Sequence, residues 1–354
     1  MSSYLIIHTG GGLGDLLLST IVIEALHRAD PQAEIDFLVR ASNKPALSAN
    51  PHLRQILTCD APRPAWSQLP RWMARLRAQR YQTALLLWSN TPWAYALWGA
   101  GIPRRVGQDS RFSYSWTFTH PVPIRSEHGD THSHWTEILL DFVRALDLPV
   151  ASDLRPYFAI SPAAHSRALE LLKRLPPGEG PIIGFHPSKG VAHLERVWPW
   201  ERLGQYVEAL EKELGARLYL SGGPAERPLI DELLRSKSLR ALNLAGETDI
   251  ETLAALAAHS QLFVCPDSGP AHLASIVGTP VVDLFALKEE FPQRWAPRWA
   301  PYRSLRPSSW SCQREPCRKN LCPYIDCYRE ISPQQVVGAA RELLEEVSSR
   351  SISK

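Results

Sequence analysis

The chain has 354 residues, 21% of them charged and 44% hydrophobic, which is the composition of a globular protein of about two domains. Its 39 basic and 36 acidic residues leave a formal net charge of +3, so we expect neither a nucleic-acid partner nor another general polyanion. No apolar run is long enough to span a bilayer, and no basic leader with a cleavage site precedes the first apolar run, so we expect a cytoplasmic protein.

The amino-terminal segment has the pattern of a βαβ unit with a glycine-rich turn. Residues 4–8 predict a buried strand, residues 9–15 a turn, residues 16–27 a helix and residues 33–39 a second strand. The turn fails the dinucleotide fingerprint G-x-G-x-x-G, because Asp15 stands at the third glycine position, and no G-K-[ST] follows. The glycines therefore favour close approach of a substrate to the backbone. Asp15 either faces that substrate or caps the following helix, and the sequence leaves both open.

Residues 61–108 contain no Asp, Glu or Lys. The segment instead holds seven arginines and five tryptophans, namely Arg63, Arg71, Arg75, Arg77, Arg80, Arg104, Arg105, Trp66, Trp72, Trp88, Trp93 and Trp98. Apolar residues at helical spacing among Arg71, Arg75 and Arg77 predict a helix that faces an anionic acceptor or an anionic membrane surface. The alternative is a core-packed helix with a solvated arginine face, and the missing acidic residues favour the first interpretation.

The middle of the chain continues the alternation of strands and helices. Residues 81–88 and a segment from Val106 predict strands, and residues 136–146 predict a helix. Four histidines between positions 120 and 134 are too loosely spaced to predict a metal site. A join at 149–180 precedes a second pattern that again begins with a strand.

This alternation in both halves predicts two doubly wound α/β domains that face each other across a cleft. We expect an amino-terminal domain at 1–160, a second domain at 161–330 and a closing helix within 331–354 that packs back on the first domain.

A strand, turn and helix near position 267 have the pattern of an anion site. Residues 262–264 predict a buried strand, residues 267–270 a turn, and residues 271–277 a helix. Parallel sheets bind anions at such a point, because free backbone N–H groups and the helix dipole point outward. His272 lies about one turn into the helix. The alternative, a well-capped helix with an incidental histidine, does not explain the polar cluster as a whole.

Five motifs in order resemble glycosyltransferase family 9, the bacterial heptosyltransferases of lipopolysaccharide core assembly. They are Gly12-Leu13-Gly14-Asp15; His186-Pro187-Ser188 with Arg196-Val197-Trp198-Pro199; Gly222-Gly223-Pro224-Ala225-Glu226; Leu244-Ala245-Gly246; and Asp267-Ser268-Gly269-Pro270-Ala271-His272. The tail from Cys327 to Val336 is also similar to the family's carboxyl end. Each motif alone is weak, but the ordered set covers nearly the whole chain.

The resemblance implies a GT-B fold with an acceptor domain followed by a nucleotide-sugar domain. It implies inverting transfer of a sugar, typically heptose from ADP-heptose, to a lipopolysaccharide core precursor. The partners implied are an ADP-sugar donor, an anionic lipid-linked saccharide acceptor and peripheral contact with the inner membrane at its cytoplasmic face.

Carried over by position, the resemblance also implies roles for single residues. Asp15 would be the general base, as a carboxylate on a glycine turn suits one-step displacement. Support for the departing diphosphate would come from a set comprising Ser188, Arg196, Asp267, Ser268, Gly269 and His272. Glu226 would bind the donor ribose. Gly12 would lie on the acceptor side, where the composition of residues 61–108 independently predicts Arg71, Arg75 and Arg77.

We expect no required cofactor or metal, because no D-x-D triplet occurs and arginine and helix ends can serve the diphosphate. One departure is that family members often have lysine where Arg196 stands, and guanidinium is not equivalent to ammonium. The donor sugar is therefore less firmly implied than the fold.

The carboxyl-terminal region holds Cys312, Cys317, Cys322 and Cys327 at every fifth position. Such a set could bind zinc, but zinc modules usually pair cysteines two to four residues apart, so we expect reduced thiols or one disulfide formed on oxidation. Three alternatives to heptosyl transfer remain: a transferase using another nucleotide sugar, a nucleotide-sugar-binding protein without turnover, and a nucleotide-sugar epimerase. The epimerase ranks last because no further paired acid and base residues are evident.

Overall fold

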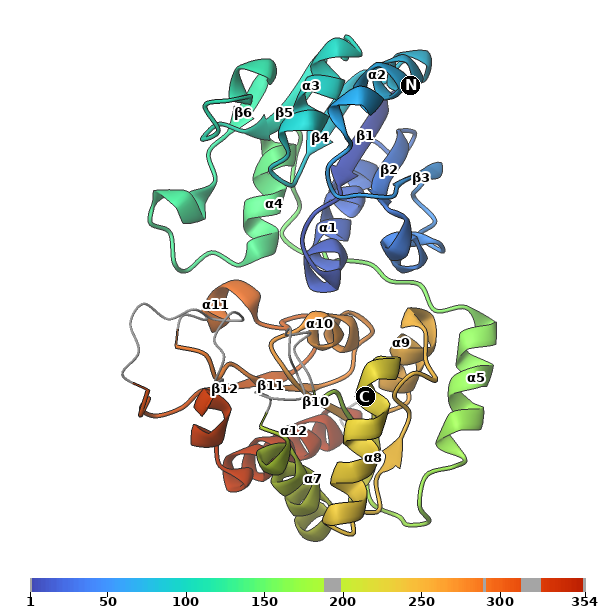
Figure 1. The fold of residues 1–354 in the computed structure, drawn as a ribbon, viewed down its shortest axis with the longest axis vertical. Coiled ribbons are helices and arrows are strands. Elements are labelled where there is room, and N and C mark those ends of the chain that lie inside the picture. Colours follow the sequence, from blue (N-terminus) through green and yellow to red (C-terminus); the bar gives the residue numbers. More distant parts are fainter. Residues whose placement is uncertain (1, 188–198, 289–290, 313–325, 353–354) are drawn as a thin grey trace. The chain divides into compact units, whose positions relative to one another are not determined.

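A computed structural model describes residues 2–187, 199–288, 291–312 and 326–352 (Figure 1). The chain divides into two compact units, Met1–Ala159 and Ile160–Lys354. This division lies one residue from the boundary expected between 160 and 161. Within the described residues, each unit contains a six-stranded sheet in which every paired neighbour is parallel.

The sheet of the first unit has the strand order β3-β2-β1-β4-β5-β6. Its strands are β1 (Ser3–His8), β2 (Glu34–Arg40), β3 (Gln55–Cys59), β4 (Thr83–Leu86), β5 (Arg104–Gln108) and β6 (His120–Val122). The central strands are almost completely buried because helices cover both faces of a doubly wound sheet, and β2 buries Asp36 along with its apolar residues.

The helices of the first unit are α1 (Leu13–Ala29), α2 (Leu69–Ala78), α3 (Thr91–Gly99) and α4 (Trp135–Arg144). α1 lies on one face of the sheet, and α2 and α3 lie on the other. Right-handed crossovers produce this arrangement, because the chain adds β2 and β3 on one side of β1 and then β4, β5 and β6 on the other side. Trp93 and Leu76 fill the core under α2 and α3. α1 and α4 pack together on the other face, as Figure 1 shows.

The second sheet repeats the winding of the first, with the order β12-β11-β10-β7-β8-β9. Its strands are β7 (Ile182–Phe185), β8 (Arg217–Leu220), β9 (Leu242–Asn243), β10 (Leu262–Pro266), β11 (Val281–Leu284) and β12 (Tyr302–Leu305). The helices are α5 (Pro162–Leu172), α7 (Trp200–Leu214), α8 (Arg227–Ser236), α9 (Ile250–Ala258), α10 (Gly269–Ile276), α11 (Pro292–Trp295) and α12 (Pro333–Ile352). The expected fold class of two doubly wound parallel domains is confirmed.

The closing helix α12 belongs to the second unit. Its apolar residues, including Val336, Val337, Ala340 and Leu343, lie in the core that contains Tyr206 of α7. These contacts assign the apolar face of α12 to the core of the second unit. The packing of 331–354 on the first domain stays a prediction. Among the described residues, no helix has the length and apolar character needed to cross a membrane.

Each sheet has a point at which the winding changes direction. β1 lies between β2 and β4, and β7 lies between β8 and β10. Ligands of open α/β sheets bind beyond the carboxyl ends of the strands at this point, where the loops on the two sides diverge. The turn after β1 and the loops after β7, β8 and β10 are therefore the places where a site is expected.

Candidate functional site

The glycine turn after β1 presents Asp15 at the carboxyl edge of the first sheet. Gly11 has a φ of 66°, in the region that glycine tolerates best, and α1 begins two residues later. Asp15 lies in the first turn of α1, where its Oδ2 accepts a hydrogen bond from the Gly12 N–H at 2.7 Å. The carboxylate therefore stabilises the start of the helix and remains only partly buried.

Three residues that the sequence analysis did not select surround this turn. Arg40, the last residue of β2, donates from Nη2 to the carbonyl oxygen of Gly11 at 2.8 Å. Trp88 packs so closely that a β-carbon on Gly10 would lie 2.0 Å from its Nε1. His8, the last residue of β1, has its ring 5.7 Å from the Trp88 ring. Their positions in the sequence could have indicated these residues as site candidates, because all three stand at or just after the ends of predicted strands.

His8 is held as a neutral imidazole. It is 1% exposed, and burial lowers its pKa from 6.5 to about 4, with the nearby charge of Arg40 acting in the same direction. Its Nδ1 has no hydrogen-bond partner among the described residues. A neutral histidine adds no positive charge at the carboxyl end of β1 at neutral pH.

The segment after β3 is tied to this edge through Pro62. The Pro62 carbonyl oxygen accepts from Thr9 Oγ1 at 2.6 Å and from Asn90 Nδ2 at 2.7 Å. Asn90 also caps α3, since its Oδ1 accepts from the Trp93 N–H at 3.3 Å. The ends of β1, β3 and β4 are thus joined into one polar edge.

The three arginines expected on the acceptor side have different surroundings. Arg71 is exposed, and the guanidinium of Arg75 lies 5.1 Å from the centre of the Trp72 ring. Arg77 donates from Nη2 to the carbonyl oxygen of Gly99 at 2.6 Å, and so satisfies the carboxyl end of α3. Arg77 therefore stabilises the carboxyl end of α3, a structural role that Arg71 does not have among the described residues.

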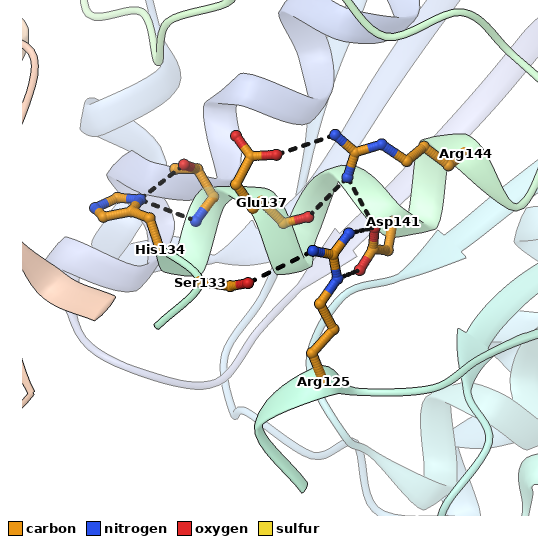
Figure 2. Close-up of polar contacts among 7 residues, drawn as sticks. Arg125, Ser133, His134, Glu137, Asp141 and Arg144 are labelled. Carbon is orange, nitrogen blue, oxygen red and sulfur yellow. Dashed lines mark hydrogen bonds and ion pairs between the residues drawn. The ribbon is translucent and has the colours of Figure 1, made fainter. Parts of the chain in front are cut away.

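The segment between β6 and α4 is fastened by the charge network drawn in Figure 2. Arg125 donates from Nε and Nη2 to the two oxygens of Asp141, at 2.6 Å each. Arg144 donates from Nη1 to Asp141 Oδ1 at 2.8 Å and from Nη2 to Glu137 Oε2 at 3.0 Å, and so links the two carboxylates. His134 caps α4, because its Nδ1 accepts from the Thr136 N–H at 3.2 Å. One of the four histidines near this segment therefore has a structural role.

In the second unit, Glu226 lies in the short helical turn Pro224–Glu226, in the connection that follows β8. It is 7% exposed, and its Oε2 accepts from the Gly223 N–H at 2.6 Å. Its Oε1 is buried and has no hydrogen-bond partner among the described residues. A buried carboxylate oxygen is costly to leave unpaired, so this atom is a candidate acceptor for a ligand hydroxyl.

His186 connects β8 to the neighbouring strands. Its ring Nδ1 lies 3.0 Å from Ser221 Oγ, and its backbone N–H donates to the carbonyl oxygen of Val264 at 3.0 Å. Burial lowers the pKa of His186, and the charge of Glu226 opposes this effect. The histidine thus lies between the Glu226 turn and the end of β10.

The loop from β10 to α10 supplies the third part of this edge. Ser268 has extended backbone and precedes Gly269, the first residue of α10. His272, one turn into the helix, is 3% exposed, and its Nδ1 has no hydrogen-bond partner among the described residues. Burial lowers the pKa of His272, while the charge of Asp267 opposes that shift. The arrangement offers helix N–H groups and a neutral imidazole, which suits a diphosphate.

Several predicted site residues lie outside the described residues. They are Ser188, Arg196, Cys317 and Cys322. Cys327 is buried beside Tyr328, and Cys312 is partly exposed. Within the part of the chain that the structure describes, no group of His, Cys, Asp and Glu side chains is placed to hold a metal ion.

Comparison with known proteins finds a family model that matches most of the chain. The sequence model described as glycosyltransferase family 9 (heptosyltransferase) matches residues 70–327. Lipopolysaccharide heptosyltransferase 3 of Escherichia coli K12 is 27% identical over 357 residues, which cover 94% of this chain and 96% of that protein.

Two solved structures show the same fold. The glycosyl transferase family 9 protein of Veillonella parvula has a TM-score of 0.80 at 20% identity, and the match covers 98% of each chain. The ADP-heptose lipopolysaccharide heptosyltransferase II of E. coli has a TM-score of 0.76 at 23% identity, and the match covers 98% of this chain and 100% of that chain. The GT-B fold class is confirmed.

Proposed function

The chain belongs to glycosyltransferase family 9, and on that premise we propose that it transfers heptose from ADP-heptose to a lipopolysaccharide core or another lipid-linked saccharide. The proposal draws on a relative named lipopolysaccharide heptosyltransferase 3, which matches over almost the entire chain. It also draws on a structural neighbour whose name specifies ADP-heptose. In this proposal the transfer inverts the anomeric centre and requires no metal or other cofactor.

The observation that carries the donor assignment is the unpaired oxygen of Glu226. Oε2 is fixed by the Gly223 N–H, and Oε1 has no partner among the described residues, at the winding point of the second sheet. A ribose presents two hydroxyl donors, so one of them can satisfy Oε1. The ADP part of the donor would thereby be held beyond β8.

The diphosphate would bind at the amino end of α10. The backbone after Asp267, including Ser268 and Gly269, offers N–H donors, and His272 offers an imidazole N–H from a buried position. Ser188 and Arg196 are proposed to complete this set with a hydroxyl and a fixed positive charge. Together these groups would stabilise the charge that develops on the leaving ADP.

The reaction would proceed in one displacement with Asp15 as general base. The acceptor hydroxyl oxygen attacks the anomeric carbon of heptose while its proton passes to the Asp15 carboxylate, and the bond from that carbon to the diphosphate oxygen breaks. Because attack and departure occur on opposite sides, the anomeric configuration inverts. Gly12 would let the acceptor approach the backbone beside Asp15.

The acceptor would be anionic and attached to lipid. Arg71 and Arg75 would face its phosphate or carboxylate groups, with Arg77 holding the helix end next to them. The enzyme would therefore act at the cytoplasmic face of the inner membrane, through peripheral contact.

Calorimetry of the purified chain with ADP-heptose, ADP, UDP and GDP tests the donor assignment. We expect the ADP compounds to bind selectively, Glu226→Gln to weaken them by about tenfold to a hundredfold, and Asp15→Asn to leave them unchanged. Glu232→Gln, an exposed glutamate on α8, is the matched control. Preference for UDP or GDP would overturn the donor assignment, and loss of binding in the control would show a non-specific effect.

The alternative of a nucleotide-sugar-binding protein without turnover makes a separate prediction. It requires ADP-heptose to bind without release of ADP in the presence of any lipopolysaccharide core acceptor. Product formation with any such acceptor would eliminate it.

A further inference from the structure

A group of aromatic side chains is exposed on the first unit. Trp66 is 60% exposed, Trp98 50% and Trp116 59%, and Phe112 projects completely into solvent. These residues come from the segment before α2, from the end of α3 and from the loop after β5. Single exposed apolar residues are ordinary, but a contiguous group on a soluble unit indicates an interaction surface.

The rings form a continuous row. Ring centres are 5.7 Å apart for Trp66 and Tyr95, 5.8 Å for Tyr95 and Trp116, and 5.5 Å for Trp116 and Trp98. Tyr95 Oη also donates to the carbonyl oxygen of Ser113 at 3.1 Å, which ties the loop carrying Phe112 to α3. We call Trp66, Tyr95, Trp98, Phe112 and Trp116 the aromatic surface.

The backbone that carries the aromatic surface is held by buried or capping contacts. Arg105 donates from Nε to the carbonyl oxygen of Thr117 at 2.7 Å, beside Trp116. Arg77 donates to the carbonyl oxygen of Gly99, beside Trp98. α2 and the short helical turn at Ser115–Thr117 both pack on α3, whose position next to α2 is visible in Figure 1. The rings are therefore presented from fixed elements.

Positive charge accompanies the rings. Arg63 and Arg71 flank Trp66 in the sequence, Arg104 follows Trp98, and all three are exposed. No acidic residue occurs between 61 and 108, and in the loop after β5 Arg111 forms an ion pair with Glu127. Tryptophan and tyrosine prefer the headgroup level of a bilayer, because one end of the side chain is apolar and the other is polar. Arginine near an anionic leaflet contributes further attraction.

We propose that the aromatic surface docks the enzyme on the headgroup region of an anionic phospholipid bilayer, with the rings inserted at the interface and the arginines among the lipid phosphates. The inference builds on the proposed function by naming the surface through which peripheral membrane contact is made. It is separable from that function, because vesicle binding requires neither donor nor acceptor.

Co-sedimentation with large unilamellar vesicles tests the proposal on the full chain. Vesicles of phosphatidylethanolamine with phosphatidylglycerol are compared with vesicles of phosphatidylcholine alone. We expect binding to the anionic vesicles, lowered by at least about tenfold in the triple variant Trp98→Ser, Phe112→Ser, Trp116→Ser. The control variant Leu169→Ser, Tyr302→Ser removes exposed apolar residues of the second unit and should bind as the parent does.

A second variant removes charge and keeps the rings. Arg71→Gln with Arg104→Gln should weaken binding to anionic vesicles at low salt, and added salt should narrow the difference from the parent chain. Arg167→Gln with Arg235→Gln, which removes two exposed arginines of α5 and α8, is the matched control. Brominated lipid should quench less tryptophan fluorescence in Trp98→Phe, Trp116→Phe than in the parent chain.

Three results would overturn the proposal. The parent chain could fail to bind anionic vesicles, or the triple variant could bind them as tightly as the parent. The triple variant could instead change the oligomeric state with vesicle binding intact, which would assign the surface to a second copy of the chain. Calorimetric binding of ADP-heptose, measured on the same samples, reports separately on folding and on the proposed function.

Discussion

A β-carbon on Gly11 would lie 2.7 Å from Oδ2 of Asp15. The backbone of Gly11 is at a φ of 66°, and its carbonyl oxygen accepts from Arg40. The turn is thus held on one side by β2 and filled on the other by the carboxylate. No side chain at position 11 can be accommodated without moving Asp15 or the turn.

Gly11→Ala should lose activity well beyond its loss of stability. The left-handed backbone alone costs about 1 kcal/mol for alanine, and displacement of Asp15 should lower kcat by about a hundredfold. Transfer kinetics and thermal unfolding of the same samples measure the two effects.

Gly101→Ala provides the matched control for this prediction. Gly101 also has a positive φ, 73°, but a β-carbon there would meet no atom within 4 Å. The Gly101→Ala variant should lose about as much stability as Gly11→Ala, while its kcat stays unchanged. Equal kinetics for the two variants would mean that the geometry of Asp15 does not limit the reaction.

The stability of the first unit should fall as the pH falls below the ordinary pKa of histidine. The pKa of His8 is lowered from 6.5 to about 4 in the folded state, so the unfolded chain takes up the proton first. The stabilisation is complete above about pH 6.5 and is lost as the pH approaches 4. Between about pH 7.5 and pH 5 this amounts to about 2 kcal/mol.

Native-state hydrogen exchange of the β1 amides, corrected for the intrinsic pH dependence of exchange, measures this change. His8→Leu should remove that part of the pH dependence, whatever its effect on stability at neutral pH. An unchanged pH profile in the variant would contradict the assignment of the shift to His8.

The arginines of α2 should separate into two classes. Arg71→Gln and Arg75→Gln should raise the KM for acceptor while the midpoint of thermal unfolding stays unchanged, because neither guanidinium bonds to a backbone carbonyl among the described residues. Arg77→Gln should destabilise the first unit by about 1 kcal/mol, because it leaves the end of α3 without its donor. Unchanged acceptor kinetics in the first two variants would remove α2 from the acceptor site.

The sequence predicted the central strands and the glycine turn because both have strong local signals. Residues 4–8, 33–39 and 81–88 are rich in apolar and β-branched residues, and they correspond to β1, β2 and β4. The edge strands β3, β6 and β12 were not predicted. β6 has only three residues, β3 alternates buried and partly buried positions, and β12 has no fully buried residue, so their apolar pattern is weak.

The site was predicted where motifs are contiguous and was missed where residues meet through the sheet. Asp15 and Glu226 follow glycines in sequence, so both could be selected. Arg40 reaches the glycine turn from a neighbouring strand, and His8 could be selected only once its burial was known. The different surroundings of Arg71 and Arg77 likewise depend on how α2 packs on α3, which helical periodicity does not determine.

The most direct test of the central claim is transfer of heptose itself. The full chain is incubated with ADP-heptose and a lipopolysaccharide core acceptor, and the product mass, the released ADP and the anomeric configuration are measured. The account predicts one heptose added per ADP released, with inverted configuration, and a loss of about a thousandfold or more in Asp15→Asn with ADP-heptose binding retained. Asp60→Asn, an exposed aspartate of the same unit, should transfer at the parent rate. Transfer at the parent rate by Asp15→Asn, or retention of configuration, would contradict the account.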